Sequence, residues 1–559
     1  MATLLTELTA DFSRGMIDDI SAIAYPPNAA ADITNGRIQP DGTVRRRPGS
    51  QRTHATVIVT DGTGYGGILF TTAGGTEQLI AFIDNKAHKS ENSGSTWTEI
   101  ATGLREDYYS LVIMRVGATN YLFAANGDTT VKRWDGTTWD TIPNAPSGVK
   151  YIAEFNRRLW YAGHSGVIAQ ATKVADPTII ASPDGLTVQV RELPTGLYQI
   201  GPHLLVFGED ETAYIDGYGR QDLIVATGAT GFSRSVGCIA FRTIQGVGEN
   251  AVCWLSKRGI EYYTPGSEIM LVSRGLQSFF QTIDRDQILA NSGNPSGVYD
   301  EVSQEYWCAL STTGAQNNRV AVVNLLHRGR GWLGACSVDE LSGPSSPAGT
   351  ELFFVVGADG YLANQAGGSA LRLGTDGYLV FAAAGESTLP TELAADGYFD
   401  TAITDAVAAT LFVGPSSRGT CVYSVGYDGF VRRHDDVDYS GVNLDDVRSD
   451  DTLGIAVELG MVSRPFLRKA PSRRKRVRAV QVASINDSAV SVTVAVRAAG
   501  ATLGTQTVTI PLTAQNQPQR KVVRMYATAD SPQVEVTSEA DVRIALIGTV
   551  AEVLREQIG

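Results

Sequence analysis

A short hairpin pattern occurs twice in the first third of the chain, and it restricts the possible folds more than any other feature. The first copy reads Ser-Glu-Asn-Ser-Gly-Ser-Thr-Trp and ends at Trp97, and the second reads Trp-Asp-Gly-Thr-Thr-Trp and ends at Trp139. The two tryptophans are 42 residues apart, which is the length of one four-stranded propeller blade. Each copy places a glycine where a tight turn needs a positive φ. We therefore predict a β-propeller in which the tryptophans lie over the turns and pack between neighbouring blades.

The first copy resembles the Asp-box, Ser-x-Asp-x-Gly-x-x-Trp, of sialidase-type and other β-propellers, with Asn92 in place of the aspartate. The box is a structural turn. The resemblance therefore implies a fold and no particular chemistry.

Short β-branched and aromatic runs, separated by Gly, Asp, Asn and Ser, continue from residue 51 to residue 440. At roughly 40–55 residues per blade, this length holds six to eight blades, and we expect seven. The repeat is poorly kept between Tyr263 and Val320, so we expect long insertions in some blades. The segment from Gln277 to Ile288 has helical spacing and is a candidate insertion.

The charge pattern changes abruptly after residue 434. Seven aspartates between residues 435 and 451 precede a basic stretch from Arg464 to Arg478, which marks a domain boundary. Clean alternation of apolar and polar residues follows, as in an antiparallel β-sandwich. The predicted organisation is an all-β chain with an N-terminal arm (1–50), a β-propeller (51–440), a charged linker (441–474) and a C-terminal antiparallel β-sandwich (475–559).

Composition narrows the class of protein. The chain has 559 residues and a net charge of −13, so it is not a nucleic-acid-coating protein. Its five cysteines show no metal or disulfide spacing, and we expect buried free thiols. The N-terminus lacks the pattern of a secretory signal, and no apolar run is long enough to span a membrane. We expect folding in a reducing cytoplasm and no membrane span.

Residues 12–49 carry a second resemblance. The stretch opens with Phe12-Ser-Arg-Gly15. It continues with Pro26-Pro27, the run Asn35-Gly-Arg-Ile, the turn Asp41-Gly42, a basic run and Arg47-Pro-Gly. This order resembles the opening of the tail hub, or nozzle, proteins of short-tailed bacteriophages, sometimes described as packaged-DNA stabilisation proteins. From the residues alone, we expect a strand pair that closes the propeller ring, with its arginines on a solvated edge.

The resemblance implies a structural virion protein of the phage tail, assembled in the host cytoplasm. It implies a homo-oligomeric ring, expected to be a hexamer, around the DNA exit channel, with the adaptor and fibres as further partners. DNA would pass without specific binding. The alternatives are a propeller-type glycan-binding or glycan-cleaving tail component and a fibre-attachment protein.

No catalytic constellation stands out, so we expect no enzyme activity, no cofactor and no metal. The six histidines never pair at metal-ligand spacing, and there is no Gly-x-Ser-x-Gly elbow. The run from Asp436 to Ser440 begins like a calcium loop, but Val447 occupies the twelfth position, where an EF-hand needs an acid. A solvated acidic loop is the main interpretation and a bound cation the alternative. Gly64-Tyr-Gly-Gly67 is followed by a strand-like run, which does not suit a nucleotide site.

The basic runs are the candidate contact residues. We expect subunit or partner contacts at Arg45, Arg46, Arg47, Arg473, Arg474, Lys475 and Arg476. For the run from Arg473 to Arg476, the alternatives are a solvated face and DNA contact. Because phosphate contacts would retard passing DNA, positions that face the ring lumen should be acidic or neutral.

Overall fold

The computed structural model describes residues 4–340 and 410–553 with short gaps, and between them four short strands from 354 to 381. The residues of the two long ranges that are not described are 20, 22–23, 55, 61, 182–183, 220–221, 227–232, 234, 284, 286–287, 289–293, 313–315, 327–333, 417–418, 428, 435–444, 447–454, 467–473, 486–489, 499–500, 511–517 and 540–541.

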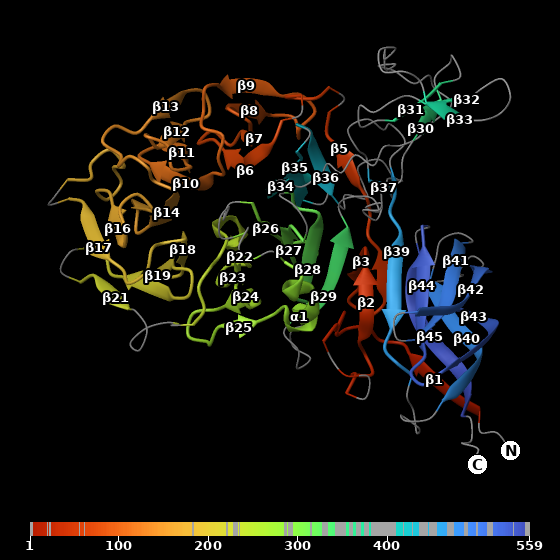
Figure 1. Ribbon diagram of the computed structural model, residues 1–559. Coiled ribbons are helices and arrows are strands. Elements are labelled where there is room, and N and C mark those ends of the chain that lie inside the picture. Colours follow the sequence, from red (N-terminus) through yellow and green to blue (C-terminus); the bar gives the residue numbers. More distant parts are fainter. Residues whose placement is uncertain are drawn as a thin grey trace. The chain divides into compact units, whose positions relative to one another are not determined.

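Seven groups of four antiparallel strands follow one another around a ring (Figure 1). Six are separate sheets, and one is part of a nine-stranded sheet. A β-propeller of seven blades is therefore confirmed. The first five blades comprise β6 (Gly64–Thr71), β7 (Glu77–Ile83), β8 (Lys86–Ser90), β9 (Thr98–Ala101), β10 (Ser110–Val116), β11 (Thr119–Ala125), β12 (Lys132–Trp134), β13 (Trp139–Thr141), β14 (Tyr151–Phe155), β15 (Arg158–Ala162), β16 (Ile168–Ala171), β17 (Leu186–Gln189), β18 (Gly196–Ile200), β19 (His203–Phe207), β20 (Thr212–Asp216), β21 (Ile224–Ala226), β22 (Gln245–Gly246), β23 (Val252–Ser256), β24 (Gly259–Tyr263) and β25 (Met270–Leu271).

The last two blades complete and close the ring. The sixth comprises β26 (Ser296–Asp300), β27 (Glu305–Leu310), β28 (Arg319–Asn324) and β29 (Ala335–Glu340). The seventh comprises β34 (Thr410–Ser416), β35 (Gly419–Val425), β36 (Val431–His434) and, from the N-terminal part of the chain, β5 (Ser50–Arg52). Strand β5 pairs antiparallel with β36, so two distant segments share one sheet.

The two repeated hairpins form the predicted turns. In the first, the Ser90 hydroxyl accepts a hydrogen bond from Gly94 N (3.0 Å), and Asn92 Oδ1 accepts one from Thr96 N (2.9 Å). In the second, Asp135 Oδ1 accepts hydrogen bonds from the backbone N–H groups of the two threonines after Gly136 (2.8 and 2.6 Å). Both glycines have positive φ, as the turns require.

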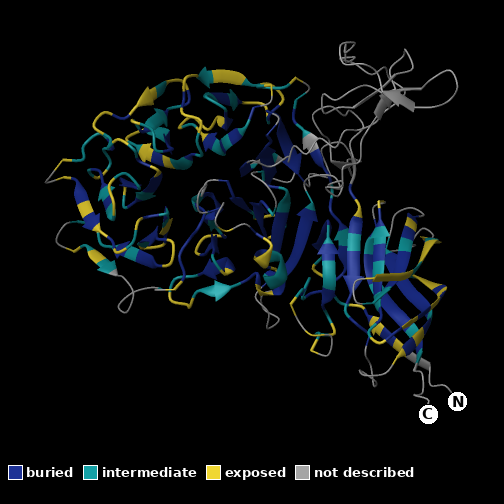
Figure 2. Cartoon of the chain, in the orientation of Figure 1, coloured by how far each residue is buried: buried dark blue, intermediate teal, exposed yellow. Residues whose placement is uncertain are grey.

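Each tryptophan packs towards the preceding blade. Trp139 of the second blade lies 5.8 Å from the ring of Phe82 in the first. Trp97 of the first blade packs against a cluster that includes Tyr423 and Val431 of the seventh. Figure 2 shows that exposed residues lie on outer strands such as β9, whereas second strands such as β7 are almost fully buried between the blades. The predicted packing between blades is confirmed.

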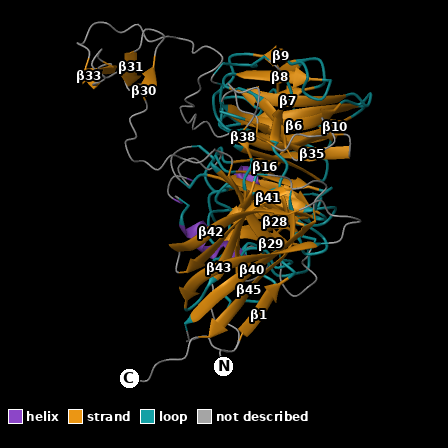
Figure 3. Ribbon diagram, turned by 90° about the vertical axis from the view of Figure 1, so that its right-hand side faces the viewer, coloured by secondary structure: helices purple, strands orange, loops and turns teal. Residues whose placement is uncertain are grey.

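Two further sheets form the β-sandwich (Figure 3). In the first, β3 (Gly36–Ile38), β4 (Val44–Arg46), β45 (Arg543–Val553), β40 (Lys475–Ile485) and β43 (Gln519–Ala529) lie in that order, and β1 (Leu4–Thr9) also pairs with β45. In the second, the order is β2 (Ala30–Thr34), β39 (Leu459–Ser463), β44 (Gln533–Ser538), β41 (Val490–Ala498) and β42 (Ala501–Ile510).

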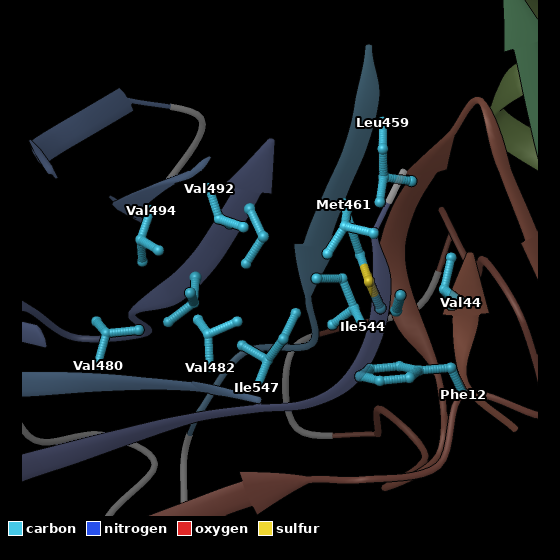
Figure 4. Packing of buried hydrophobic residues seen from close by; sticks show 14 of the residues in the cluster. Phe12, Val44, Leu459, Met461, Val480, Val482, Val492, Val494, Ile544 and Ile547 are labelled. Atoms are coloured by element: carbon cyan, nitrogen blue, oxygen red, sulfur yellow. The ribbon is translucent and has the colours of Figure 1, made fainter. Parts of the chain in front are cut away.

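The apolar side chains of the two sheets meet in one core (Figure 4). Val480 and Val482 point into it from β40, and Val492 and Val494 from β41. Alternate residues of a strand face opposite sides of the sheet, so the alternation in the sequence decides which side is buried. Phe12, from the N-terminal segment, fills the same core.

One sheet continues from the propeller into the sandwich. Strand β2 pairs in parallel with β29 of the sixth blade through Thr34 and Val338, and antiparallel with β39. Close contact between backbones supports this joint, since a Cβ atom on Gly15 (φ +68°) would lie 2.5 Å from Cys336 N. The nine-stranded sheet therefore links the two parts.

The expected roles of two segments are corrected by these pairings. The β3–β4 pair belongs to the sandwich, and the ring is closed by β5 instead. The predicted linker 441–474 contributes β39, an internal strand of the sandwich sheet. The reason is that alternation predicts a strand without predicting its partner.

Helical structure is scarce among the described residues. Two 3₁₀ turns, η2 (Phe241–Thr243) and η3 (Arg274–Leu276), and the helix α1 (Gln277–Gln281) are found there, so the expected helical insertion is present in short form. No helix in the described ranges is long and apolar enough to cross a membrane. All five cysteines are free and buried, which confirms that expectation.

Residues 342–405 form a separate compact unit, inside the range predicted as propeller. Its described part is one sheet of four short strands: β30 (Phe354–Val356), β31 (Tyr361–Asn364), β32 (Leu371–Leu373) and β33 (Leu379–Phe381). A further two-stranded sheet, β37 (Asp445–Asp446) with β38 (Ile455–Ala456), belongs to the larger unit.

Candidate functional site

A cavity of about 550 Å³ lies at the propeller axis. Residues from the first strand of every blade line it: β6, β10, β14, β18, β22, β26 and β34, together with η2. This volume is typical of a small-ligand pocket.

The lining combines apolar side chains with a few polar ones. Glu154 is the one carboxylate among the described lining residues, and its Oε1 accepts a hydrogen bond from Arg157 N (2.9 Å). Glycoside hydrolysis normally needs two carboxyl groups, about 5–10 Å apart. The described lining does not provide that pair.

A buried polar network joins several blades beside the cavity. The Arg242 guanidinium lies 4.7 Å from the centre of the Tyr108 ring and bonds the hydroxyl groups of Ser296 (3.4 Å) and Thr410. Burial lowers the pKa of Arg242 to about 10, so the side chain stays charged at neutral pH. These contacts connect the second, fifth, sixth and seventh blades.

Asn294 extends this network. Its Oδ1 accepts hydrogen bonds from the hydroxyls of Tyr108 (3.0 Å) and Tyr427 (2.9 Å). Burial raises the pKa of both phenols, so both remain protonated donors at neutral pH. The arrangement provides cross-blade support, and no nucleophile lies next to a general base in it.

The N-terminal motif forms a second buried network, between sandwich and propeller. Arg37 of β3 donates to Asp339 Oδ1 (2.8 Å), and its Nη2 lies 2.7 Å from Oδ2. Its Nε is 3.3 Å from Glu305, and its guanidinium stacks 4.5 Å from the centre of the Trp307 ring. The sixth blade contains all three partners, Asp339, Glu305 and Trp307. Arg37 of the N-terminal arm therefore contacts three side chains of that blade.

Arg46 and Arg47 complete this joint. They are 1% and 2% exposed. Arg46 donates to Val457 O (2.7 Å), and Arg47 donates to Asn35 Oδ1 and to Glu340 O, both at 3.1 Å. The expectation of a solvated arginine edge is therefore wrong for these two residues, because the chain itself surrounds them. For the half-exposed Arg45, subunit contact stays a prediction.

The C-terminal basic run has mixed environments. Arg473 lies outside the described residues. Arg474 is exposed and 3.7 Å from Asp530, whereas Lys475 is buried and donates to Asp530 O (2.8 Å). Burial lowers the pKa of Lys475. Arg476 is exposed, so Arg474 and Arg476 remain available for the predicted partner contacts.

The remaining candidates have structural roles or lie outside the described part. The run from Asp436 to Ser440 is not among the described residues. Gly64 to Gly67 lies in β6, where a Cβ atom on Gly67 would approach the Phe412 ring to 2.4 Å, so tight packing accounts for that glycine. No group of three or more His, Cys, Asp or Glu residues in the described part could hold a metal ion.

Sequence reasoning missed both buried networks. Arg37 and Asp339 are 302 residues apart, and neither stands in a motif with the other. The one available signal was Arg37 next to Ile38 in a strand-like run, a position at which burial would demand a counter-charge.

The solved structures compared with this chain below are distant likenesses. No protein-family model and no curated protein matches the chain. Among solved structures, a chain in the crystal structure of the mitotic checkpoint complex is similar over 69% of this chain and 94% of its own length, with 12% identity and a TM-score of 0.37. The N-terminal domain of Nup159 is similar over 73% of this chain and 99% of its own, with 10% identity and a TM-score of 0.37. The strand pairings described above establish the seven-bladed fold independently of these likenesses.

Proposed function

We propose that this chain is a structural protein of a short-tailed phage tail, which forms a hub or nozzle ring around the DNA exit channel. The most direct support comes from the N-terminal stretch 12–49, which resembles the opening of those tail proteins. Its residues from Asn35 to Arg47 supply the buried joint between propeller and sandwich.

A rigid joint suits such a role. Ring subunits around a channel must keep their interfaces in register while DNA moves past them. A continuous sheet and a charged network with both partners buried resist bending between the two parts. The function therefore relies on scaffold geometry, with DNA passing between subunits rather than through the small axial cavity of one propeller.

The charge of the chain supports the same proposal. A net charge of −13 per chain would place about −78 around a six-membered ring. Such a field repels a polyanion and keeps it from adhering.

Imaging of the assembled phage particle tests the proposal. The expected result is several copies of the chain, most simply six, arranged symmetrically around the tail axis. A single asymmetric copy, or a position away from the axis, would overturn it. Release of reducing sugar from host polysaccharide by the purified protein would instead favour a glycan-cleaving tail component.

A further inference from the structure

The outer face of the first sandwich sheet is basic, although the whole chain is acidic. On β43, alternate residues from Arg520 to Thr528 are exposed, while Val523 and Met525 point into the core. Strand β40 continues the same outer face, because Arg476 is paired with Thr528 and Ala479 with Arg524. We call the outer side chains Arg476, Arg478, Arg520, Val522, Arg524 and Tyr526 the basic face.

Some of these cations make no ion pair in the described part of their own chain. Arg478 is paired with Glu552 (2.6 Å), and Arg520 donates to Gln481. Arg476 and Arg524 are exposed and make no ion pair within the described part of the chain, and neither does Lys521 at the rim of the face. Two arginines without an ion pair on the exposed face of one sheet are suited to bind carboxylates, which they can engage in a bidentate manner.

The basic face also has an apolar component. Tyr526 is 70% exposed and Val522 54% exposed. Leu8, which is 40% exposed, lies in the same cross-strand row as Val522, because Leu8 pairs with Gly548, Gly548 with Gln481 and Gln481 with Val522. Exposed aromatic and apolar side chains among arginines are typical of a protein–protein contact.

A matching acidic segment occurs in the same chain. Residues 435–451 contain seven aspartates and one arginine. The two of these aspartates that the structure describes form β37, which lies beside the ring-closing strand β5 and pairs with β38. The described part of the acidic segment, β37, therefore lies beside the strand that completes the seventh blade, whereas the basic face lies on the first sandwich sheet.

Two complementary surfaces at different places on one chain favour head-to-tail association, which closes into a ring when the rotation permits. We propose that the basic face of one copy binds the aspartate-rich segment 435–451 of the next copy. This inference rests on the proposed ring and specifies the contact between its neighbouring subunits. A polypeptide is favoured over nucleic acid because the field of the whole chain repels a long polyanion, whereas a short acidic segment meets only the local charge.

A peptide-binding assay on the full-length chain tests this contact without requiring ring assembly. The probe is a fluorescein-labelled peptide of residues 435–451, measured by anisotropy against the wild-type protein. We expect saturable binding that weakens as salt is raised from about 0.05 to 0.5 M, because exposed charges are screened over about 10 Å at 0.1 M. A peptide with all seven aspartates changed to asparagine should not bind.

Variants locate the contact. The double variant Arg476→Glu with Arg524→Glu should weaken peptide binding by at least about tenfold, since two attractions become repulsions. The matched control is Arg115→Glu with Arg285→Glu, which reverses two exposed arginines of the propeller part and should bind like wild type. Thermal melting of both variants should match wild type, which verifies folding.

Three outcomes would overturn the inference: no peptide binding, equal loss in the two double variants, or preferential binding of a single-stranded oligonucleotide to the basic face. If the peptide fails but the particle contains a symmetric ring, only this inference falls. If the peptide binds while the particle holds one asymmetric copy, the proposed ring falls and the contact remains as self-association.

Discussion

At the scale of single residues, the arginines of the N-terminal motif show that a buried charge is far more sensitive to substitution than an exposed one. Arg37 and Arg47 are enclosed with Asp339, at 2.7 and 3.9 Å. A buried ion pair contributes little when compared with a well-packed apolar core, yet removing one partner leaves an isolated buried charge. These residues are therefore sensitive to substitution without being catalytic.

Replacing Asp339 tests the joint. Asp339→Ala should lower the free energy of unfolding by about 3 kcal/mol, because Arg37 loses its two contacts with Asp339 and keeps only the carboxylate of Glu305 at 3.3 Å. Urea denaturation followed by tryptophan fluorescence measures the change. The control is Glu99→Ala, which removes an exposed pair with Lys86 (side chains 45% and 38% exposed) and should cost far less than Asp339→Ala, because water screens exposed ion pairs. Equal effects would mean that the joint is not a stabilising contact.

His88 makes stability depend on pH. It is buried in the first blade, its Nδ1 has no hydrogen-bond partner in the described part, and burial lowers its pKa. The unfolded chain, with a pKa near 6.5 at this residue, binds the proton more tightly than the folded chain. The free energy of unfolding should therefore fall as pH drops below about 6.5 and level off below the folded-state pKa.

Denaturation at about pH 7.5 and pH 5.5 measures this loss. His88→Gln should show a smaller loss than wild type. The half-buried His164, whose pKa is lowered by the same cause, provides a comparison variant, His164→Gln, with the same direction. A loss in His88→Gln as large as in wild type would assign the pH dependence to other groups.

At the scale of elements, the decisive strand is β5. It closes the propeller by joining a sheet whose other strands come from residues 410–434. Thr53 N donates to Val431 O (3.0 Å), and hydrogen-bonded pairs alternate along an antiparallel ladder. By that alternation, Gln51 and Arg433 form the next hydrogen-bonded pair.

A proline in β5 should open this closure. Gln51→Pro removes the N–H that pairs with β36 and should lower the free energy of unfolding by about 1–3 kcal/mol. It should also make β36 more sensitive to limited proteolysis. Gln51→Ala keeps the backbone donor and serves as the control. If both variants behave alike, the ladder bond at this position does not hold the ring closed.

At the scale of the whole molecule, the net charge of −13 predicts that the chain binds DNA weakly. Duplex DNA at roughly physiological salt should bind more weakly than the 10⁻⁴–10⁻⁶ M that is usual for non-specific binding. Anisotropy of a labelled duplex, titrated with the protein at two salt concentrations, measures this. Tight binding with a steep salt dependence, together with an arginine- and lysine-rich lumen in the assembled ring, would mean that the protein clamps DNA.

The sequence by itself determined the local elements. The turns at Asn92 and Asp135 use side chains within four residues of the groups that they bond, so their chemistry is visible in a short window. The spacing of the tryptophans indicated the blade length, and the alternation after residue 475 indicated the sandwich. Each of these features depends on neighbours along the chain, which is why a single sequence was sufficient for the fold class.

Only the tertiary structure decided which elements meet. Strand β2 lies between β29 and β39, although more than 300 residues separate it from either. The burial of Arg46 and Arg47 follows from that placement, and so does the partnership of Arg37 with Asp339. Alternation states which side of a strand is apolar, but many strands share the same pattern. The choice among them depends on how well distant side chains pack and neutralise one another, and that energy exists only once the strands are together.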